Sequence, residues 1–175
     1  MMKSFPIVLT ALILTATGFT ESQAGQRRGL NVALVPSVQV FNDLAEVKGA
    51  RLNVIGDNLA MTGLDLGLIN MVDERFMGAA LGVANSVKGQ ATGFQGGLFN
   101  FAGEMRGMQL GLSNRATRLQ GLQLGFANYA HENNWLQIGA VNIANNRQGW
   151  QIGLMNFNLE PTASFHGMIF VNGAF

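Results

Sequence analysis

Large apolar side chains alternate with small or polar ones along most of this chain. In residues 121–126, for example, Leu122, Leu124 and Phe126 are separated by Gln and Gly. A period of two is typical of a β-strand, whereas a helical pattern repeats near every 3.6 residues. Each such stretch therefore predicts a strand with one bulky apolar face and one small polar face.

The alternating stretch recurs about nine times with a period close to fourteen residues, which indicates a repeat architecture. The clearest copies are residues 107–114, 121–128, 135–142 and 149–156; earlier copies end at Asn70, Asn85 and Asn100, and degenerate copies cover 49–56 and 165–172. From Asn70 onward, the closing Asn residues are 15, 15, 14, 14, 14, 14 and 16 residues apart. With the places of a copy numbered one to eight, places one, three and five are mostly Gly, Gln and Gly, and place eight is Asn.

The links between copies decide the expected fold. They are about five or six residues long and polar, as in residues 131–134, so they predict turns. Parallel neighbours need a crossover of about a dozen residues or more, whereas antiparallel neighbours need only a hairpin. We therefore expect an all-β fold, an antiparallel up-and-down meander of about 8–10 short strands closing into a β-barrel. The alternatives are a soluble sandwich and a parallel β-solenoid, which needs a second inward-facing strand in every coil.

Charge is scarce, and this bears on which face meets water. Charged residues make up 12% of the chain, and the nine copies contain only Arg51 and Asp65. A soluble sheet normally has one hydrated face, whereas an outer-membrane barrel turns bulky residues to lipid and small polar ones inward. The pattern favours the second arrangement, with Arg51 and Asp65 able to pair inside; the sandwich would bury the bulky residues instead.

The first 24 residues predict a secretory signal peptide. Lys3 is followed by an apolar run over residues 5–19 and by the small-x-small site Ser22-Gln23-Ala24. An uncleaved anchor is the alternative. Residues 25–175 are then a single repeat-built β domain, exported to the outer membrane or cell surface, with the periplasm or secretion as the alternative.

The repeated segments, such as Gly121-Leu-Gln-Leu-Gly-Phe-Ala-Asn128, resemble a family of uncharacterised bacterial exported or surface proteins with Gly-Leu-Gln-Leu-Gly-Leu-x-Asn repeats. The resemblance covers about residues 49–172. It implies export and a repeat-built surface protein, and it brings no activity. The chain departs from the pattern at Arg51, Asp65 and Ala80, where Gln is expected, and at Gly96, where Leu is expected.

The sequence contains no constellation typical of catalysis. The two histidines, His131 and His166, lack metal-ligand spacing, and Cys is absent. A net charge of +1 gives no electrostatic reason to bind nucleic acid. We expect a protein that is not an enzyme and has no cofactor, metal site or nucleic-acid partner. Outer-membrane lipid is the expected partner, and no protein or glycan partner is identified.

Several repeated or unusual residues are candidates for a binding role. The possible polar lining is a row of glutamines, which either hydrogen-bond along the sheet or line a lumen or groove for a polar solute: Gln95, Gln109, Gln123, Gln137 and Gln151. The Asn row is expected to form turns, since Asn tolerates left-handed conformations. The place-five glycines predict a belt on the inner face of a curled sheet. Trp135 and Trp150 are either interfacial anchors or core aromatics.

These observations predict a non-catalytic structural β-barrel protein of the outer membrane or surface. The alternative is a soluble exported binding module that uses a Gln/Asn-lined face for a polar solute or glycan.

Overall fold

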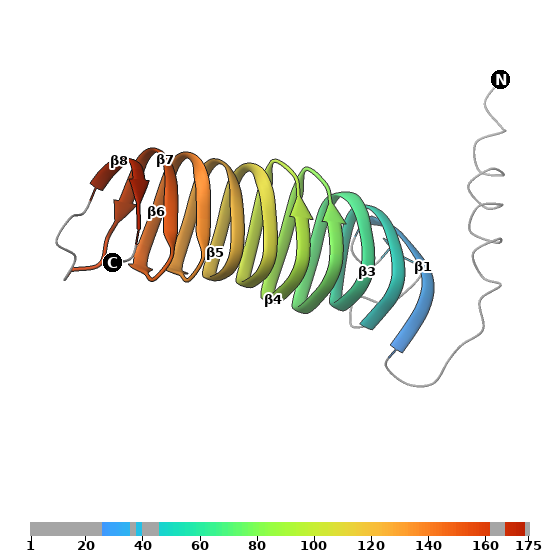
Figure 1. Cartoon of the computed structure of the whole chain (residues 1–175). Helices are drawn as coiled ribbons and strands as arrows, with labels where there is room; N and C mark the ends of the chain where they lie inside the picture. Colours follow the sequence, from blue (N-terminus) through green and yellow to red (C-terminus); the bar gives the residue numbers. More distant parts are fainter. Residues whose placement is uncertain (1–25, 36–37, 40–45, 162–166, 174–175) are drawn as a thin grey trace, which may run out of the picture.

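A computed structural model describes residues 26–35, 38–39, 46–161 and 167–173, and these residues form a β-solenoid (Figure 1). The strands are β1 (Gln26–Val35), β2 (Val38–Gln39), β3 (Glu46–Leu81), β4 (Ala84–Gly96), β5 (Phe99–Asn133), β6 (Leu136–Arg147), β7 (Trp150–Asn158) and β8 (Gly167–Asn172). They pair in the order β2-β1-β3-β4-β5-β6-β7-β8. The pairs from β1 to β7 are parallel, and only the outermost pairs, β1–β2 and β7–β8, are antiparallel.

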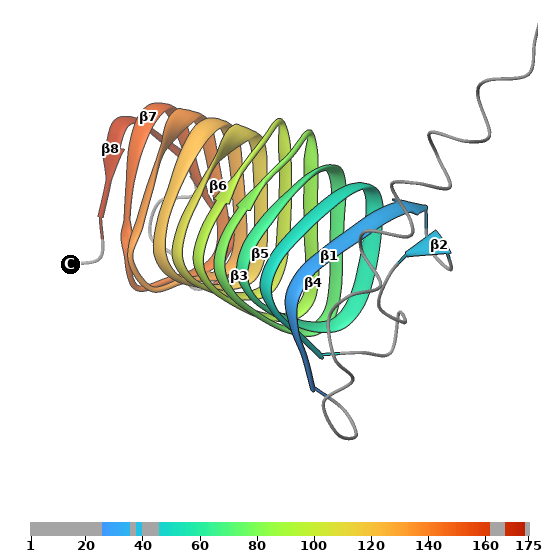
Figure 2. The ribbon, with the colours of Figure 1, turned by 90° about the vertical axis from the view of Figure 1, so that its right-hand side faces the viewer.

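The chain winds in coils that stack along one axis (Figures 1 and 2). Equivalent residues of successive copies lie side by side, as Gly125 does with Gly139 and Asn128 with Asn142. Neighbouring strands in a sheet are roughly 4.8 Å apart, which sets the rise of each coil. A coil usually has fourteen places, of which the repeat's eight are the first. The longer coils place their extra residue on the return side, where the register shifts between Val87 and Gln90.

The expected antiparallel barrel is therefore wrong, and the solenoid alternative is right; the all-β and repetitive character is confirmed. The polar links were misread as turns, but they are the second side of each coil. On this return side, places ten and thirteen face inward and are mostly apolar. Buried examples are Val72, Val87, Ala102, Ala116, Ala130 and Ala144 at place ten, and Phe76, Ala91, Met105 and Leu119 at place thirteen. The return side itself is the crossover that parallel pairing requires.

The two faces of the repeated strand point in the directions that the charge pattern predicts, with the bulky face outward and the small polar face inward. Gln at place three and Asn at place eight are buried, whereas place four and place six point outward, with Leu112 56% and Phe126 65% exposed. On this repeated strand the small polar side chains are thus inside and the large apolar ones outside, although the strand belongs to a solenoid and not to a barrel. The sandwich alternative, with the bulky residues buried, is wrong.

An asparagine ladder runs through the interior at place eight. Each Asn Nδ2 donates to the Oδ1 of the Asn one coil further on, at 2.7–2.9 Å from Asn70 through Asn156. Asn53, at place five of the coil that begins at Gly49, donates to Asn70 Oδ1 at 2.7 Å and extends the ladder at that end. The same Nδ2 groups also donate to a backbone carbonyl of the following coil, as Asn114 does to Leu124 at 3.0 Å. The Asn residues thus organise the turn through side-chain bonds. The expected left-handed backbone is absent, because Phe170 is the only non-glycine residue with positive φ in the described part of the chain.

A glutamine ladder runs beside it at place three, and its amides donate in the opposite direction along the axis. Gln109, Gln123, Gln137 and Gln151 each donate from Nε2 to the Oε1 of the preceding Gln at 2.8–2.9 Å. Each also donates across the interior to a return-side carbonyl of its own coil, as Gln123 does to Tyr129 at 3.2 Å. The β8 residue Asn172 donates to Gln151 Oε1 at 3.2 Å and continues the ladder at this end. The buried amides are therefore satisfied by one another and by backbone.

Glycine at place five provides the room for this stacking. A Cβ at Gly139 would lie 2.1 Å from the Gly125 carbonyl oxygen and 2.5 Å from Asn128 Nδ2. No side chain fits in that space. The belt of inward-facing glycines expected from the sequence is confirmed, and its cause is close approach between coils.

Arg51 and Asp65 replace Gln at place three of adjacent coils, and they pair inside as expected. Arg51 Nε donates to Asp65 Oδ1 at 2.8 Å, and Nη2 donates to the second carboxylate oxygen. Nη1 donates to Asn58 Oδ1 at 2.9 Å. Both charged groups are buried at the place that the glutamines fill from Gln95 onward, and Ala80 separates the ion pair from the glutamine ladder.

The predicted signal peptide, residues 1–24, lies outside the described residues. Within the described part of the chain, no helix has the length and hydrophobicity needed to span a bilayer.

Candidate functional site: the apolar side and the tryptophan corner

One side of the solenoid exposes a continuous apolar surface, which we call the apolar side. It consists of the outward residues at places two, four and six: Leu52, Val54, Leu64, Leu68, Leu81, Val83, Leu98, Leu110, Leu112, Leu124, Phe126, Ile152 and Leu154. No charged residue points outward at places one to seven of the coils from Gly49 to Met155, since Arg51 and Asp65 face inward. Eight coils at roughly 4.8 Å make this surface about 34 Å long between its first and last rows. Contiguous apolar surfaces of this kind mark interaction sites.

The outward residues of the return side form the opposite surface, the charged side. Lys88 Nζ lies 2.7 Å from Asp73 Oδ1. Arg118 Nε lies 2.8 Å from Glu132 Oε2, and Arg118 Nη1 is 3.9 Å from Glu104 Oε2. The hydrogen bond from Arg118 lowers the pKa of Glu132 below its ordinary value, and the bond to Asp73 raises the pKa of Lys88.

An aromatic and cationic column lies on the same side. The Arg115 guanidinium stands between two rings of neighbouring coils, 5.9 Å from the Phe101 centroid and 5.3 Å from that of Tyr129. Such cation–π contacts are worth about 0.5–1 kcal/mol at exposed sites. The charged side is thus organised by contacts between coils.

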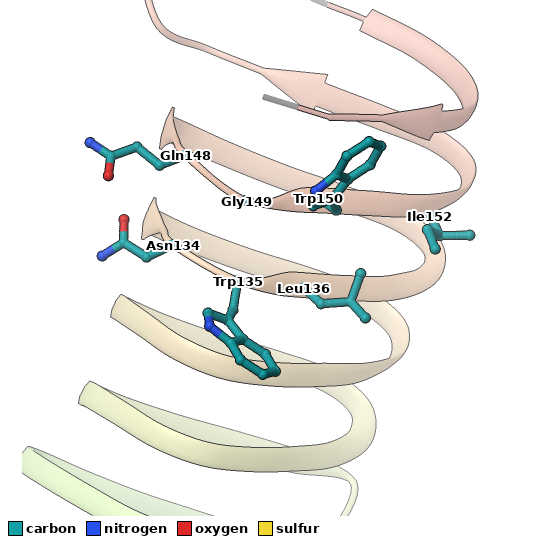
Figure 3. A pocket seen from close by; sticks show the side chains of 7 residues that line it. All are labelled: Asn134, Trp135, Leu136, Gln148, Gly149, Trp150 and Ile152. Carbon is teal, nitrogen blue, oxygen red and sulfur yellow. The ribbon is translucent and has the colours of Figure 1, made fainter. Parts of the chain in front are cut away.

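The second candidate region is the tryptophan corner, where the return side of one coil leads into the next. Trp135 occupies place one, which is Gly in the coils before it, and Trp150 occupies place two of the following coil. The two side chains are 66% and 46% exposed. An open pocket of about 510 Å³ lies between them, lined also by Asn134, Leu136, Gln148, Gly149 and Ile152 (Figure 3).

A buried amide holds the corner in shape. Asn133 stands at place thirteen, where the two preceding coils have Met105 and Leu119, and it is completely buried. Its Oδ1 accepts from the Trp135 backbone N–H at 3.2 Å, and its Nδ2 donates to the Trp150 carbonyl at 3.4 Å. The Trp150 N–H also donates to the Trp135 carbonyl at 2.6 Å. One side chain therefore connects the backbone of both tryptophans.

The positions expected from the sequence are placed as follows. The five glutamines of the possible polar lining are completely buried, and they hydrogen-bond to one another along the sheet. The core interpretation of the tryptophans is wrong, because both are exposed. His131 is exposed on the charged side, and His166 lies outside the described residues.

Sequence reasoning missed Asn133, Asn134 and Gln148 as parts of a site. The signal was the break in the repeat: Trp instead of Gly at place one, and Asn instead of an apolar residue at place thirteen. Breaks in an otherwise consistent pattern are where functional positions are expected.

No group of three or more His, Cys, Asp or Glu side chains within the described ranges could hold a metal ion. Searches of protein-family models, curated proteins and solved structures find no match to this chain. The resemblance to an exported repeat family therefore stays a prediction.

Proposed function

We propose that this chain is a non-catalytic structural protein of the bacterial surface that lies on outer-membrane lipid through its apolar side. The observation that carries the proposal is the row at place six from Val54 to Leu154, which is exposed except at the half-buried Ala140 and has no outward charge on that side. The expected export signal supplies the compartment.

Lipid is favoured over a second copy of the chain because of the shape of this surface. Place six lies at the turn between the two sides of each coil, since place five and place eight both face inward. Its side chains therefore form a convex ridge. Two convex ridges bury little area against each other, whereas sheet-on-sheet packing needs two broad faces. A ridge can instead enter the boundary between headgroups and acyl chains, as interfacial amphipathic elements do to a depth of about 5–10 Å.

The charges of the two sides support the same orientation. The charged side carries ion pairs between coils, Lys88 with Asp73 and Arg118 with Glu132, and these remain in water when the ridge faces lipid. With a net charge of +1, attraction to anionic lipid contributes little, so burial of apolar surface drives binding. Each large apolar side chain that is fully buried contributes roughly 1.5–3 kcal/mol.

Flotation with phosphatidylcholine vesicles tests the proposal, because this lipid carries no net charge. The full chain is expected to float, and the double variant Leu112→Glu/Phe126→Glu is expected to lose at least about tenfold in partitioning, since each step of about 1.4 kcal/mol is tenfold. The matched control Thr117→Glu/His131→Glu adds the same two carboxylates to the same two coils, but on the charged side. It should float like the parent.

Both double variants should unfold at nearly the parental temperature, because all four positions are exposed. Failure of the parent chain to float, or an equal loss in both variants, would contradict lipid binding through the apolar side.

A further inference from the structure

The tryptophan corner holds the only two tryptophans of the chain, at places where other coils have Gly and Leu. The Trp150 ring also lies against Gly173, where an added Cβ would be 2.5 Å from it. Place one is Gly in the five preceding coils, at Gly63, Gly78, Gly93, Gly107 and Gly121. Place two is Leu122 and Leu136 in the two coils before Trp150. The neighbouring coils therefore show that a Gly and a Leu serve the same structural places.

The backbone at place one differs between the two halves of the solenoid. Up to Gly107, the place-one glycines have φ between 120° and 140°, which only Gly adopts readily. Gly121 and Trp135 do not have positive φ, so this later path accommodates a side chain at place one. Burying an amide in place of Leu or Met is unfavourable for folding unless each polar group finds a partner, and the buried Asn133 finds its partners in the backbone of both tryptophans. The Asn133 amide thus fixes the backbone of the two tryptophans relative to each other.

The chemistry of the pocket is apolar on its wall and amide on its rim. Trp135, Trp150, Leu136 and Ile152 form the apolar wall, and the two indoles diverge from each other along the solenoid axis (Figure 3). The carboxamides of Asn134 and Gln148 stand together at one edge, one coil apart. No charged side chain belongs to this lining. An apolar pocket with a few convergent polar groups is the usual form of a small-molecule site.

We propose that the tryptophan corner binds a single neutral sugar ring of a glycan. A sugar ring has apolar C–H faces, which fit an indole, and a rim of hydroxyls, which can donate to and accept from a carboxamide at the same time. The spacing of Asn134 and Gln148, one coil or roughly 4.8 Å, is comparable with the width of such a ring. An anionic ligand would have no cation in the lining to pair with, and an acyl chain would leave the two amides unused.

Tryptophan fluorescence tests this directly, because both fluorophores line the pocket. Titration of the full chain with maltohexaose, cellohexaose and chitohexaose is expected to give a saturable change with at least one sugar, with a dissociation constant on the order of 1 mM, as befits a shallow site. The variant Asn134→Ala/Gln148→Ala keeps both fluorophores, and we expect about tenfold weaker binding from it.

A second variant separates binding from folding. Trp135→Gly/Trp150→Leu restores the residues of the neighbouring coils, and calorimetry should detect no sugar binding although the variant still unfolds cooperatively near the parental temperature. Unchanged affinity in this variant, or no saturable response to any of the three sugars, would overturn the proposal.

Vesicles of brominated phosphatidylcholine test the competing assignment, in which this corner is a lipid anchor and not a sugar site. Quenching of both tryptophans by these vesicles, together with silence towards all three sugars, would assign the corner to lipid and reject the sugar site. That result would leave the proposed lipid-binding function intact, because flotation depends on Leu112 and Phe126, which lie at a different corner of the coil.

Discussion

The apolar side and the charged side belong to the same coils and share one interior, yet they differ completely in what they expose. On the charged side, outward positions carry Lys88, Arg118 and Glu132, and the coils stack in parallel there too, with a register shift between Val87 and Gln90. Outward apolar residues are therefore unnecessary for stacking. Their concentration on one side points to a demand other than folding, which is why we propose that this side contacts lipid.

The comparison also locates the source of stability. Both sides turn inward the groups that set the register. The apolar side turns Gln and Gly inward, and the charged side, with the turn before it, turns Asn and mostly small apolar residues inward. Paired amides and close backbone contact leave little tolerance for substitution in the interior, whereas the outward-facing residues are free to vary. Substitutions inside should therefore cost much more than substitutions outside.

Gly139→Ala is one of the two substitutions with the largest expected effects. The new Cβ would lie 2.1 Å from the Gly125 carbonyl oxygen, so the coils must separate, and we expect a loss of about 3 kcal/mol or more in the free energy of unfolding. Denaturant titration measures it. Gly167→Ala is the matched control, because its Cβ would have no neighbour closer than 3.4 Å, and it should cost much less. Equal losses in both variants would refute the shared, tightly spaced interior.

The buried ion pair comes next. Asp65→Asn leaves the Arg51 guanidinium buried without its counter-charge, which should cost about 3–5 kcal/mol. The double variant Arg51→Gln/Asp65→Gln places in both coils the residue that occupies this column further along, and it should recover most of that loss. Thermal and denaturant unfolding of the three proteins measure both effects; a double variant no more stable than Asp65→Asn would show that the column does not tolerate Gln here.

An ion pair on the outside should matter least. Arg118 lowers the pKa of Glu132, so the pair stabilises the folded state above the unfolded-state pKa of about 4.3, and this stabilisation is lost as pH falls through the lower folded-state pKa. Glu132→Gln should lower the melting temperature slightly at pH 7, and the difference should vanish near about pH 3 or in high salt, because both side chains are solvent-screened. A large, salt-independent difference would contradict the contrast between inner and outer pairs.

The sequence also shows how far the candidate site could be anticipated. The uncharged apolar rows were visible in the alternation, and the exceptional Trp135 and Trp150 were visible as departures from it. Their meeting at one pocket was not, because it depends on residues fifteen positions apart lying in adjacent coils. The role of the glutamines had two interpretations in the sequence, and only burial decided between them.

By itself, the sequence determined the strand period, the fourteen-residue repeat and the assignment of side chains to two opposite faces, because alternation and spacing are local properties of the chain. It did not determine the direction of the neighbouring strands. An in-register row of identical residues arises in a parallel stack and in a symmetric hairpin array alike, so the pattern has two solutions. Tertiary structure decided between them through the return side. The inward-facing residues there, such as Ala116 and Leu119, are too few and too small to predict a buried strand from the sequence. They suffice once the coils stack and the amide ladders fill the remaining interior.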